Sequence, residues 1–130
     1  MSEFNVVGTS VRRRDLLEKV TGAAQYAVDA TMPGMVHAKV VRSERAHARI
    51  LGIDTAEALA AHDVVAVVTS ADLGPLFARF GHIIADHYIL APEKVRYFGE
   101  PVAIVLAETP AAAHDAAQLV RVDYEDLPSV

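Results

Sequence analysis

The sequence predicts a single domain of the α+β (mixed α/β) class, in which a mixed sheet packs against short helices. Residues 64–69 and 102–106 are almost entirely apolar and are bounded by turn residues, which is typical of strands covered on both faces. Each of these strands has a short helical segment beside it in the sequence, and segments with alternating polar and apolar residues supply further strands. This combination favours one sheet with helices packed on it.

Length and composition limit what this domain can be. The 130 residues suit one domain, and 52% of them are hydrophobic. The net charge of -5 is spread along the chain, which argues against nucleic-acid binding. No apolar run reaches the length of a membrane span. The chain has no cysteine, which excludes disulfides, thiolate metal sites and iron–sulfur ligation within it and fits a cytoplasmic protein.

The N-terminal part of the chain is expected to contain one short helix. Residues 1–14 are expected to be extended or disordered, and residues 15–130 to form the domain. Asp15 and Glu18 have the spacing of a capping box, and a glycine soon afterwards ends the helix. Residues 25–29 then favour an edge strand, and a proline–glycine turn follows.

Strands alternate with short helices in the middle of the chain. Residues 35–42 and 47–54 have β character. Asp54 and Glu57 form a second capping pattern, which opens a short helix through about residue 61. The first of the two apolar strands follows this helix.

The least regular part of the chain follows that strand. Residues 70–75 predict a helical turn closed by Gly-Pro. Residues 76–93 predict a loop with a helical turn at 76–80 and a short extended piece at 88–90. A loop of this length inside a domain is usually functional or a contact surface.

Residues 94–128 have the clearest order of elements. A short strand at 95–97 ends in a glycine and a Glu-Pro turn, before the second apolar strand. Thr109 is an N-cap followed by a proline, and alanines at helical spacing come next. Residues 121–125 alternate polar and apolar side chains. This order of strand, helix and strand predicts a βαβ unit or its split version.

No motif in the sequence indicates a self-contained active site. A glycine-rich phosphate loop and a GxSxG elbow are both missing. Glu100 lies in a tight turn, where a carboxylate can serve as a general base or hold neighbouring amides, and the second role is favoured. Arg42 and His47 flank another turn and can bind an anion or contact another domain, of which contact is favoured. The residues expected in turns or interfaces are Arg42, His47, Arg96, Gly99, Glu100 and Pro101.

The irregular loop offers a further candidate site. His82, Asp86 and His87 lie close together in it, and imidazole and carboxylate groups suit zinc or iron. A solvated polar loop is favoured, because no third histidine is placed to complete a ligand set. The loop at 76–93 also leaves open a stand-alone module that binds a small ligand or a protein.

Four short patterns, in one order along nearly the whole chain, resemble one family. They are Lys19-Val20-Thr21-Gly22 with Ala24, Tyr26 and Asp29; Arg42-Ser43 with Ala46-His47-Ala48-Arg49-Ile50; Leu90-Ala91 with Lys94-Val95-Arg96-Tyr97 and Gly99-Glu100-Pro101; and Val122 with Tyr124-Glu125 and Leu127-Pro128. The chain thereby resembles the N-terminal α/β hammerhead domain of the molybdenum-hydroxylase large subunit. That family includes xanthine dehydrogenase, aldehyde oxidase and aerobic carbon monoxide dehydrogenase. The chain departs from the family pattern in turns at Glu44, His62-Asp63 and His87-Tyr88, and the substrate stays undecided.

The resemblance implies an architectural role in a larger oxidoreductase. Members of the family hydroxylate aldehydes, purines and other N-heterocycles with oxygen from water. Electrons pass from a molybdopterin-type molybdenum cofactor to 2Fe-2S clusters and often to FAD. The family's molybdopterin-binding segments and catalytic glutamate lie beyond this domain, so no catalytic, cofactor-binding or metal-binding residue is expected here. The implied partners are the remainder of the molybdenum-binding subunit and the iron–sulfur and FAD subunits or domains.

Overall fold

The computed structural model describes residues 7, 8, 10–74 and 79–129. The chain divides into two compact units, Met1–Pro33 and Gly34–Val130, which we call the N-terminal unit and the hammerhead unit. No helix among the described residues is both long and apolar enough to cross a membrane.

The N-terminal unit contains two short helical elements. The predicted helix is confirmed as α1 (Leu16–Thr21), and it ends at Gly22, whose φ of 75° is left-handed. The predicted capping box is wrong, because the Asp15 carboxylate pairs instead with Arg13 at 2.7 Å and with Lys19 at 2.5 Å.

The edge strand predicted at 25–29 is also wrong. A 3₁₀-helix, η1 (Ala27–Asp29), occupies this stretch. The Asp29 carboxylate accepts a hydrogen bond from the Tyr26 amide at 2.9 Å, and the Asp29 amide donates to the Tyr26 carbonyl oxygen at 2.9 Å. This local side chain–backbone contact closes a turn where the residue pattern alone favours an extended chain.

The hammerhead unit has short helices and six strands in its described part, and this confirms the α+β class. Its helical elements are α2 (Ala56–Leu59), η2 (Ser70–Asp72) and α3 (Pro110–Ala117). Its strands are β1 (His37–Arg42), β2 (Ala48–Asp54), β3 (Val64–Thr69), β4 (Lys94–Val95), β5 (Pro101–Ala107) and β6 (Arg121–Asp126).

Two three-stranded sheets replace the single mixed sheet that the sequence predicts. Their strand orders are β1-β5-β3 and β4-β2-β6, and every pairing is antiparallel. The βαβ interpretation is therefore wrong, because β5 and β6 belong to different sheets. Both edges of β5 are already occupied, by β1 and β3, so the strand that follows α3 has no place beside β5.

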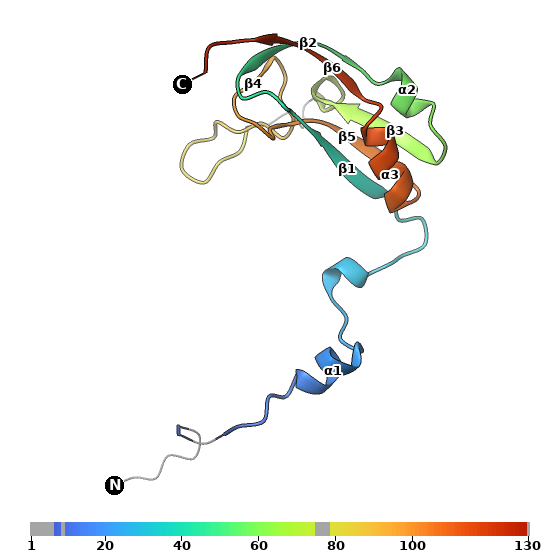
Figure 1. Cartoon of the computed structure of the whole chain (residues 1–130), viewed down its shortest axis with the longest axis vertical. Helices are drawn as coiled ribbons and strands as arrows, with labels where there is room; N and C mark the ends of the chain where they lie inside the picture. The colour runs from blue at the N-terminus through green and yellow to red at the C-terminus, as the bar shows by residue number, and fades with distance from the viewer. Residues whose placement is uncertain (1–6, 9, 75–78, 130) are drawn as a thin grey trace. The chain divides into compact units, whose positions relative to one another are not determined.

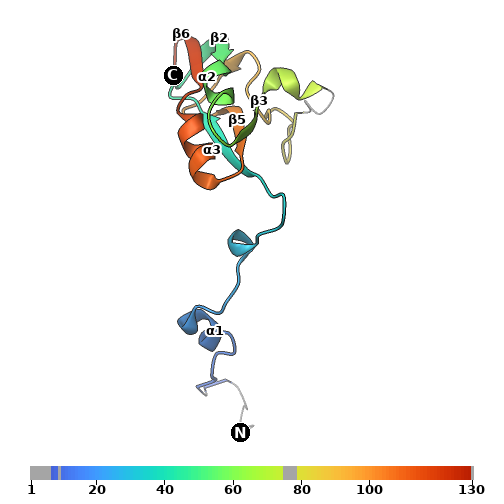
Figure 2. The ribbon, with the colours of Figure 1, turned by 90° about the vertical axis from the view of Figure 1, so that its right-hand side faces the viewer.

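β5 is the buried centre of the first sheet. Val102, Ala103, Val105 and Ala107 are fully buried, as the uninterrupted apolar pattern predicts. α3 packs on β1 and β5 through alanines, of which Ala113 and Ala116 are buried. Figure 1 shows α3 against this sheet, and Figure 2 shows it turned by 90°.

Local signals at the helix ends give mixed results. Thr109 caps α3 as predicted, because its hydroxyl oxygen accepts from the Ala112 amide at 3.1 Å and Pro110 opens the helix. The second capping pattern is only half present: the Asp54 carboxylate accepts from the Ala56 amide at 3.0 Å, whereas the Glu57 carboxylate accepts from the Arg121 guanidinium at 2.9 Å. α2 is correspondingly short and ends at Leu59, before the predicted residue 61.

The described part of the irregular stretch, residues 79–93, is a loop, as predicted. The helical turn expected at 76–80 falls largely on residues 75–78, which lie outside the described residues. The extended piece expected at 88–90 is not a strand; instead Phe80 and His87 form an isolated antiparallel bridge with two hydrogen bonds, of 2.9 and 3.0 Å.

The central position of Val105 can be tested by truncation. Val105→Ala removes two methyl groups from a fully buried site, so the free energy of unfolding should fall by about 2 kcal/mol. Val65→Ala is the matched control, because Val65 lies on the neighbouring strand β3 and is 54% exposed; we expect a change within about 0.5 kcal/mol. Urea denaturation of both variants measures this, and equal losses would contradict the burial of β5.

Candidate functional site

Two segments that carry the chain between the sheets lie side by side. Residues 43–47 lead from β1 in the first sheet to β2 in the second, and residues 96–100 lead from β4 back to β5. We call residues 42–47 and 96–101 the crossover pair. The Ser43 amide donates to the Glu100 carbonyl oxygen at 2.9 Å, and the Gly99 amide donates to the Ser43 carbonyl oxygen at 2.8 Å. These main-chain bonds tie the two crossings together.

Ser43 is the buried polar residue on one side of the crossover pair. It is 2% exposed, and its hydroxyl oxygen accepts from the Arg45 amide at 2.9 Å and donates to the Arg45 carbonyl oxygen at 3.1 Å. Tyr124 of β6 lies nearby. Burial raises the pKa of the Tyr124 hydroxyl, and a hydrogen bond with Ser43 partly opposes that rise. Tyr124 therefore serves as a neutral hydroxyl at neutral pH.

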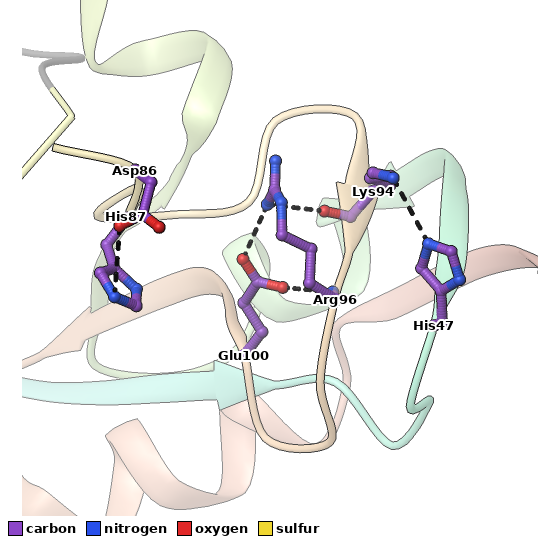
Figure 3. Close-up of polar contacts among 6 residues, drawn as sticks. All are labelled: His47, Asp86, His87, Lys94, Arg96 and Glu100. Carbon is purple, nitrogen blue, oxygen red and sulfur yellow. Dashed lines mark hydrogen bonds and ion pairs between the residues drawn. The ribbon is translucent and has the colours of Figure 1, made fainter. Parts of the chain in front are cut away.

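Glu100 is the buried polar residue on the other side, and it is 4% exposed. Its carboxylate accepts from the Arg96 amide at 2.5 Å and from the Arg96 guanidinium at 3.0 Å. Figure 3 shows these two side chains pointing toward each other. A buried carboxylate is costly unless it is paired and hydrogen-bonded, and here a single arginine supplies both contacts. These two bonds connect the ends of the 96–100 turn.

The remaining turn residues complete the same cluster. Gly99 has a φ of 89°, in the region that favours glycine, and its carbonyl oxygen accepts from the Arg42 guanidinium at 2.9 Å. Pro101 begins β5, and its carbonyl oxygen accepts a hydrogen bond from the Ala91 amide at 2.8 Å. The structure thus brings together Arg42, Arg96, Gly99, Glu100 and Pro101.

His47 lies at the edge of this cluster and has its own partners. Its Nδ1 is 2.7 Å from the Pro128 carbonyl oxygen, and its Nε2 is 3.4 Å from the Lys94 ammonium. A carbonyl oxygen can only accept, so Nδ1 of His47 donates the hydrogen of the bond to Pro128. Figure 3 shows His47 facing Lys94, away from Glu100. Arg42 and His47 therefore bind different carbonyl oxygens and do not converge on one anion site.

Two arginine side chains contact the ring of Tyr88, and the sequence pattern predicts neither contact. The guanidinium of Arg96 lies 5.0 Å from the centre of the Tyr88 ring, and that of Arg79 lies 4.9 Å from it. Both distances are within the range of cation–π attraction. Arg96 thus links Glu100 to the irregular loop. A single tyrosine in a loop predicts no such partner, because the contacting arginines lie eight or more positions away in the sequence.

The alternative metal site does not form. Asp86 and His87 are a solvent-exposed pair with 3.5 Å between carboxylate oxygen and Nε2, and His82 does not join them as a third ligand. Over the parts of the chain that the structure describes, no three histidine, aspartate or glutamate side chains are placed to hold a metal ion.

Comparison of the sequence with models of known protein families identifies the family of this chain. The sequence model described as "Aldehyde oxidase and xanthine dehydrogenase, a/b hammerhead domain" matches residues 21–128, which include the entire crossover pair. The chain belongs to this family. The resemblance drawn from the four short patterns is confirmed, and the hammerhead fold accounts for the two small sheets.

Individual relatives agree with this assignment. The 6-hydroxypseudooxynicotine dehydrogenase complex subunit gamma of Paenarthrobacter nicotinovorans is 43% identical over 133 residues, covering 94% of this chain and 17% of that protein. A crystal structure of Cu,Mo-CO dehydrogenase superimposes with a TM-score of 0.86 at 41% identity, covering 93% of this chain and 16% of that one. Quinoline 2-oxidoreductase from Pseudomonas putida 86 gives a TM-score of 0.84 at 40% identity, covering 95% and 16%. The hammerhead chain thus spans about a sixth of the length of these relatives.

The cofactors of such enzymes can be compared with the groups present here. The chain has no cysteine, so it cannot supply the thiolates that hold a 2Fe-2S cluster. Glu100, the one buried carboxylate in the described part of the chain, is already bound by Arg96. The residues described here therefore do not fit a site for molybdenum or for an iron–sulfur cluster.

The role of Glu100 can be tested by an isosteric change. Glu100→Gln keeps the side-chain size but places an NH₂ group opposite one of the two Arg96 donors, so the free energy of unfolding should fall by about 1–3 kcal/mol. Glu93→Gln is the matched control, because Glu93 directly precedes β4 and its side chain is exposed; a change within about 0.5 kcal/mol is expected. Chemical denaturation reports both values. Unchanged stability of Glu100→Gln would rule out the turn-holding role.

Proposed function

We propose that this hammerhead domain is the N-terminal structural domain, or a separately encoded piece, of the catalytic large subunit of a molybdopterin-dependent hydroxylase or dehydrogenase. The observation that carries the proposal is the TM-score of 0.86 at 41% identity to Cu,Mo-CO dehydrogenase over 93% of the chain. Sequence identity at this level over a whole domain supports more than a shared topology. It supports the same position of this domain within a related enzyme.

The substrate class proposed for the enzyme is aldehydes, purines or other N-heterocycles. The names of the relatives support it: they include a nicotinate dehydrogenase, a xanthine dehydrogenase subunit, a quinoline oxidoreductase and an aldehyde oxidoreductase. Most of these names specify a nitrogen heterocycle. The proposed enzyme would bind a molybdopterin-type cofactor, 2Fe-2S clusters and FAD in other domains or subunits.

The role proposed for this domain is architectural. The crossover pair uses its own polar groups to hold two sheets together, which leaves Glu100 and Ser43 no free reactive atom to offer a substrate. Within the crossover pair, Tyr97 and Phe98 are 47% and 72% exposed and line an open groove with His47. Exposed aromatic side chains of this kind are enriched in protein interfaces. We place the contact with the catalytic domain and the iron–sulfur partner on this side.

The first test is the metal content of the chain by itself. The purified 130-residue protein should contain no stoichiometric molybdenum by elemental analysis and should oxidise neither an aldehyde nor a purine. Untagged protein isolated from its own cell should instead come in a species that contains molybdenum and a molybdopterin-binding polypeptide or segment. Stoichiometric molybdenum in the chain alone would refute the architectural role, and a natural form free of molybdenum would refute the proposed enzyme.

A further inference from the structure

The irregular loop has a defined shape, although the hammerhead unit gives its outer part no core. Phe80 and His87 are joined by two main-chain hydrogen bonds, of 2.9 and 3.0 Å, and we call residues 80–87 the loop tip. Within the tip, a Cβ atom at Gly81 would overlap the Ile84 carbonyl oxygen, so the backbone there is closely folded on itself. No side chain of the tip is buried against the hammerhead unit. Its shape therefore depends on contacts at its base rather than on apolar packing.

Three side chains meet at the base of the loop tip. Arg79 directly precedes the tip and Tyr88 directly follows it, and the Arg79 guanidinium lies 4.9 Å from the centre of the Tyr88 ring. The Arg96 guanidinium lies 5.0 Å from the same centre. Tyr88 is half-buried, and Leu90 and Ala91 just beyond it are buried. We call Arg79, Tyr88 and Arg96 the loop clamp, because they join both ends of the tip to the crossover pair.

The loop clamp brings two positive charges to one ring, and Glu100 offsets one of them. The two guanidinium carbons are no more than about 10 Å apart, a separation comparable to the screening length at physiological ionic strength. The Glu100 carboxylate lies 3.0 Å from the Arg96 guanidinium, whereas Arg79 forms no ion pair with a carboxylate in the described part of the chain. Glu100 therefore both fixes the position of Arg96 and lowers its repulsion of Arg79.

We propose that Glu100 is a positioning residue for the loop tip and acts on it through Arg96 and Tyr88. While Glu100 holds Arg96, the loop clamp is complete and the bridge between Phe80 and His87 stays closed. Without that carboxylate, Arg96 leaves the ring and the tip opens, although both sheets stay folded. The coupling is reciprocal, so a molecule that binds the closed tip stabilises the pair of Arg96 and Glu100 by the same factor. This inference goes beyond the proposed function and does not depend on it, because every group involved belongs to the hammerhead unit.

Hydrogen–deuterium exchange of the Phe80 and His87 amides measures the opening of the loop tip in the purified 130-residue protein. Glu100→Gln should raise both exchange rates about two- to fivefold, which is the effect of losing one cation–π contact. Glu93→Gln, with an exposed side chain, is the matched control and should leave both rates unchanged. A general loss of stability raises exchange at amides that open by global unfolding, such as those of β5, and not at a locally opening tip. Unchanged rates at the tip in Glu100→Gln would overturn the proposal.

A double-mutant cycle shows whether the effect passes through Tyr88. Tyr88→Leu removes the ring and should raise the same two exchange rates at least as much as Glu100→Gln, because both arginine contacts are lost. Tyr88→Phe keeps the ring and should stay within about twofold of the parent protein. In the Tyr88→Leu background, Glu100→Gln should add less than about a twofold change, because the connection is already broken. A full effect of Glu100→Gln in that background, or a tip opened equally by Tyr88→Phe and Tyr88→Leu, would show that the loop clamp does not carry the coupling.

Discussion

The fold depends on one constraint: of the five passages that the chain makes between the two sheets, two, at residues 43–47 and 96–100, must pair. Each sheet has only three strands, and neither has a large core of its own. Ser43 and Glu100 join the crossings by main-chain hydrogen bonds, and their buried side chains are satisfied locally by Arg45 and Arg96. Unpaired polar groups at this depth would destabilise the domain, so the two crossings are stable only when both are formed.

This constraint explains why a polar cluster with the composition of a catalytic site is hydrogen-bonded within itself. Glu100 has the burial of a functional carboxylate, yet both its oxygens accept hydrogen bonds from Arg96. Arg96 in turn stacks on Tyr88, which connects the rigid crossing to the exposed loop. The cluster therefore links the crossover pair to the irregular loop.

The sequence predicts this fold well where the signals are local. The cap at Thr109 and the alternation along β6 follow from neighbouring residues alone, and both are present. The choice between one sheet and two depends on which strands flank β5, and no local pattern encodes that pairing. The same limit applies to the site: the turn around Gly99 is predictable, whereas its contact with Arg42 spans 57 positions. Two short-range hydrogen bonds between Tyr26 and Asp29 close a 3₁₀-helix where the sequence predicts a strand.

Native-state hydrogen exchange of the two sheets tests the coupling through the crossover pair most directly. If the paired crossings make one cooperative unit, the slowest amides of β2 and of β5 open with the same free energy, within about 0.5 kcal/mol, and that value equals the global free energy of unfolding. If instead β2 opens at a clearly lower free energy while β5 stays protected, the sheets are independent and the crossover pair does not hold the domain together.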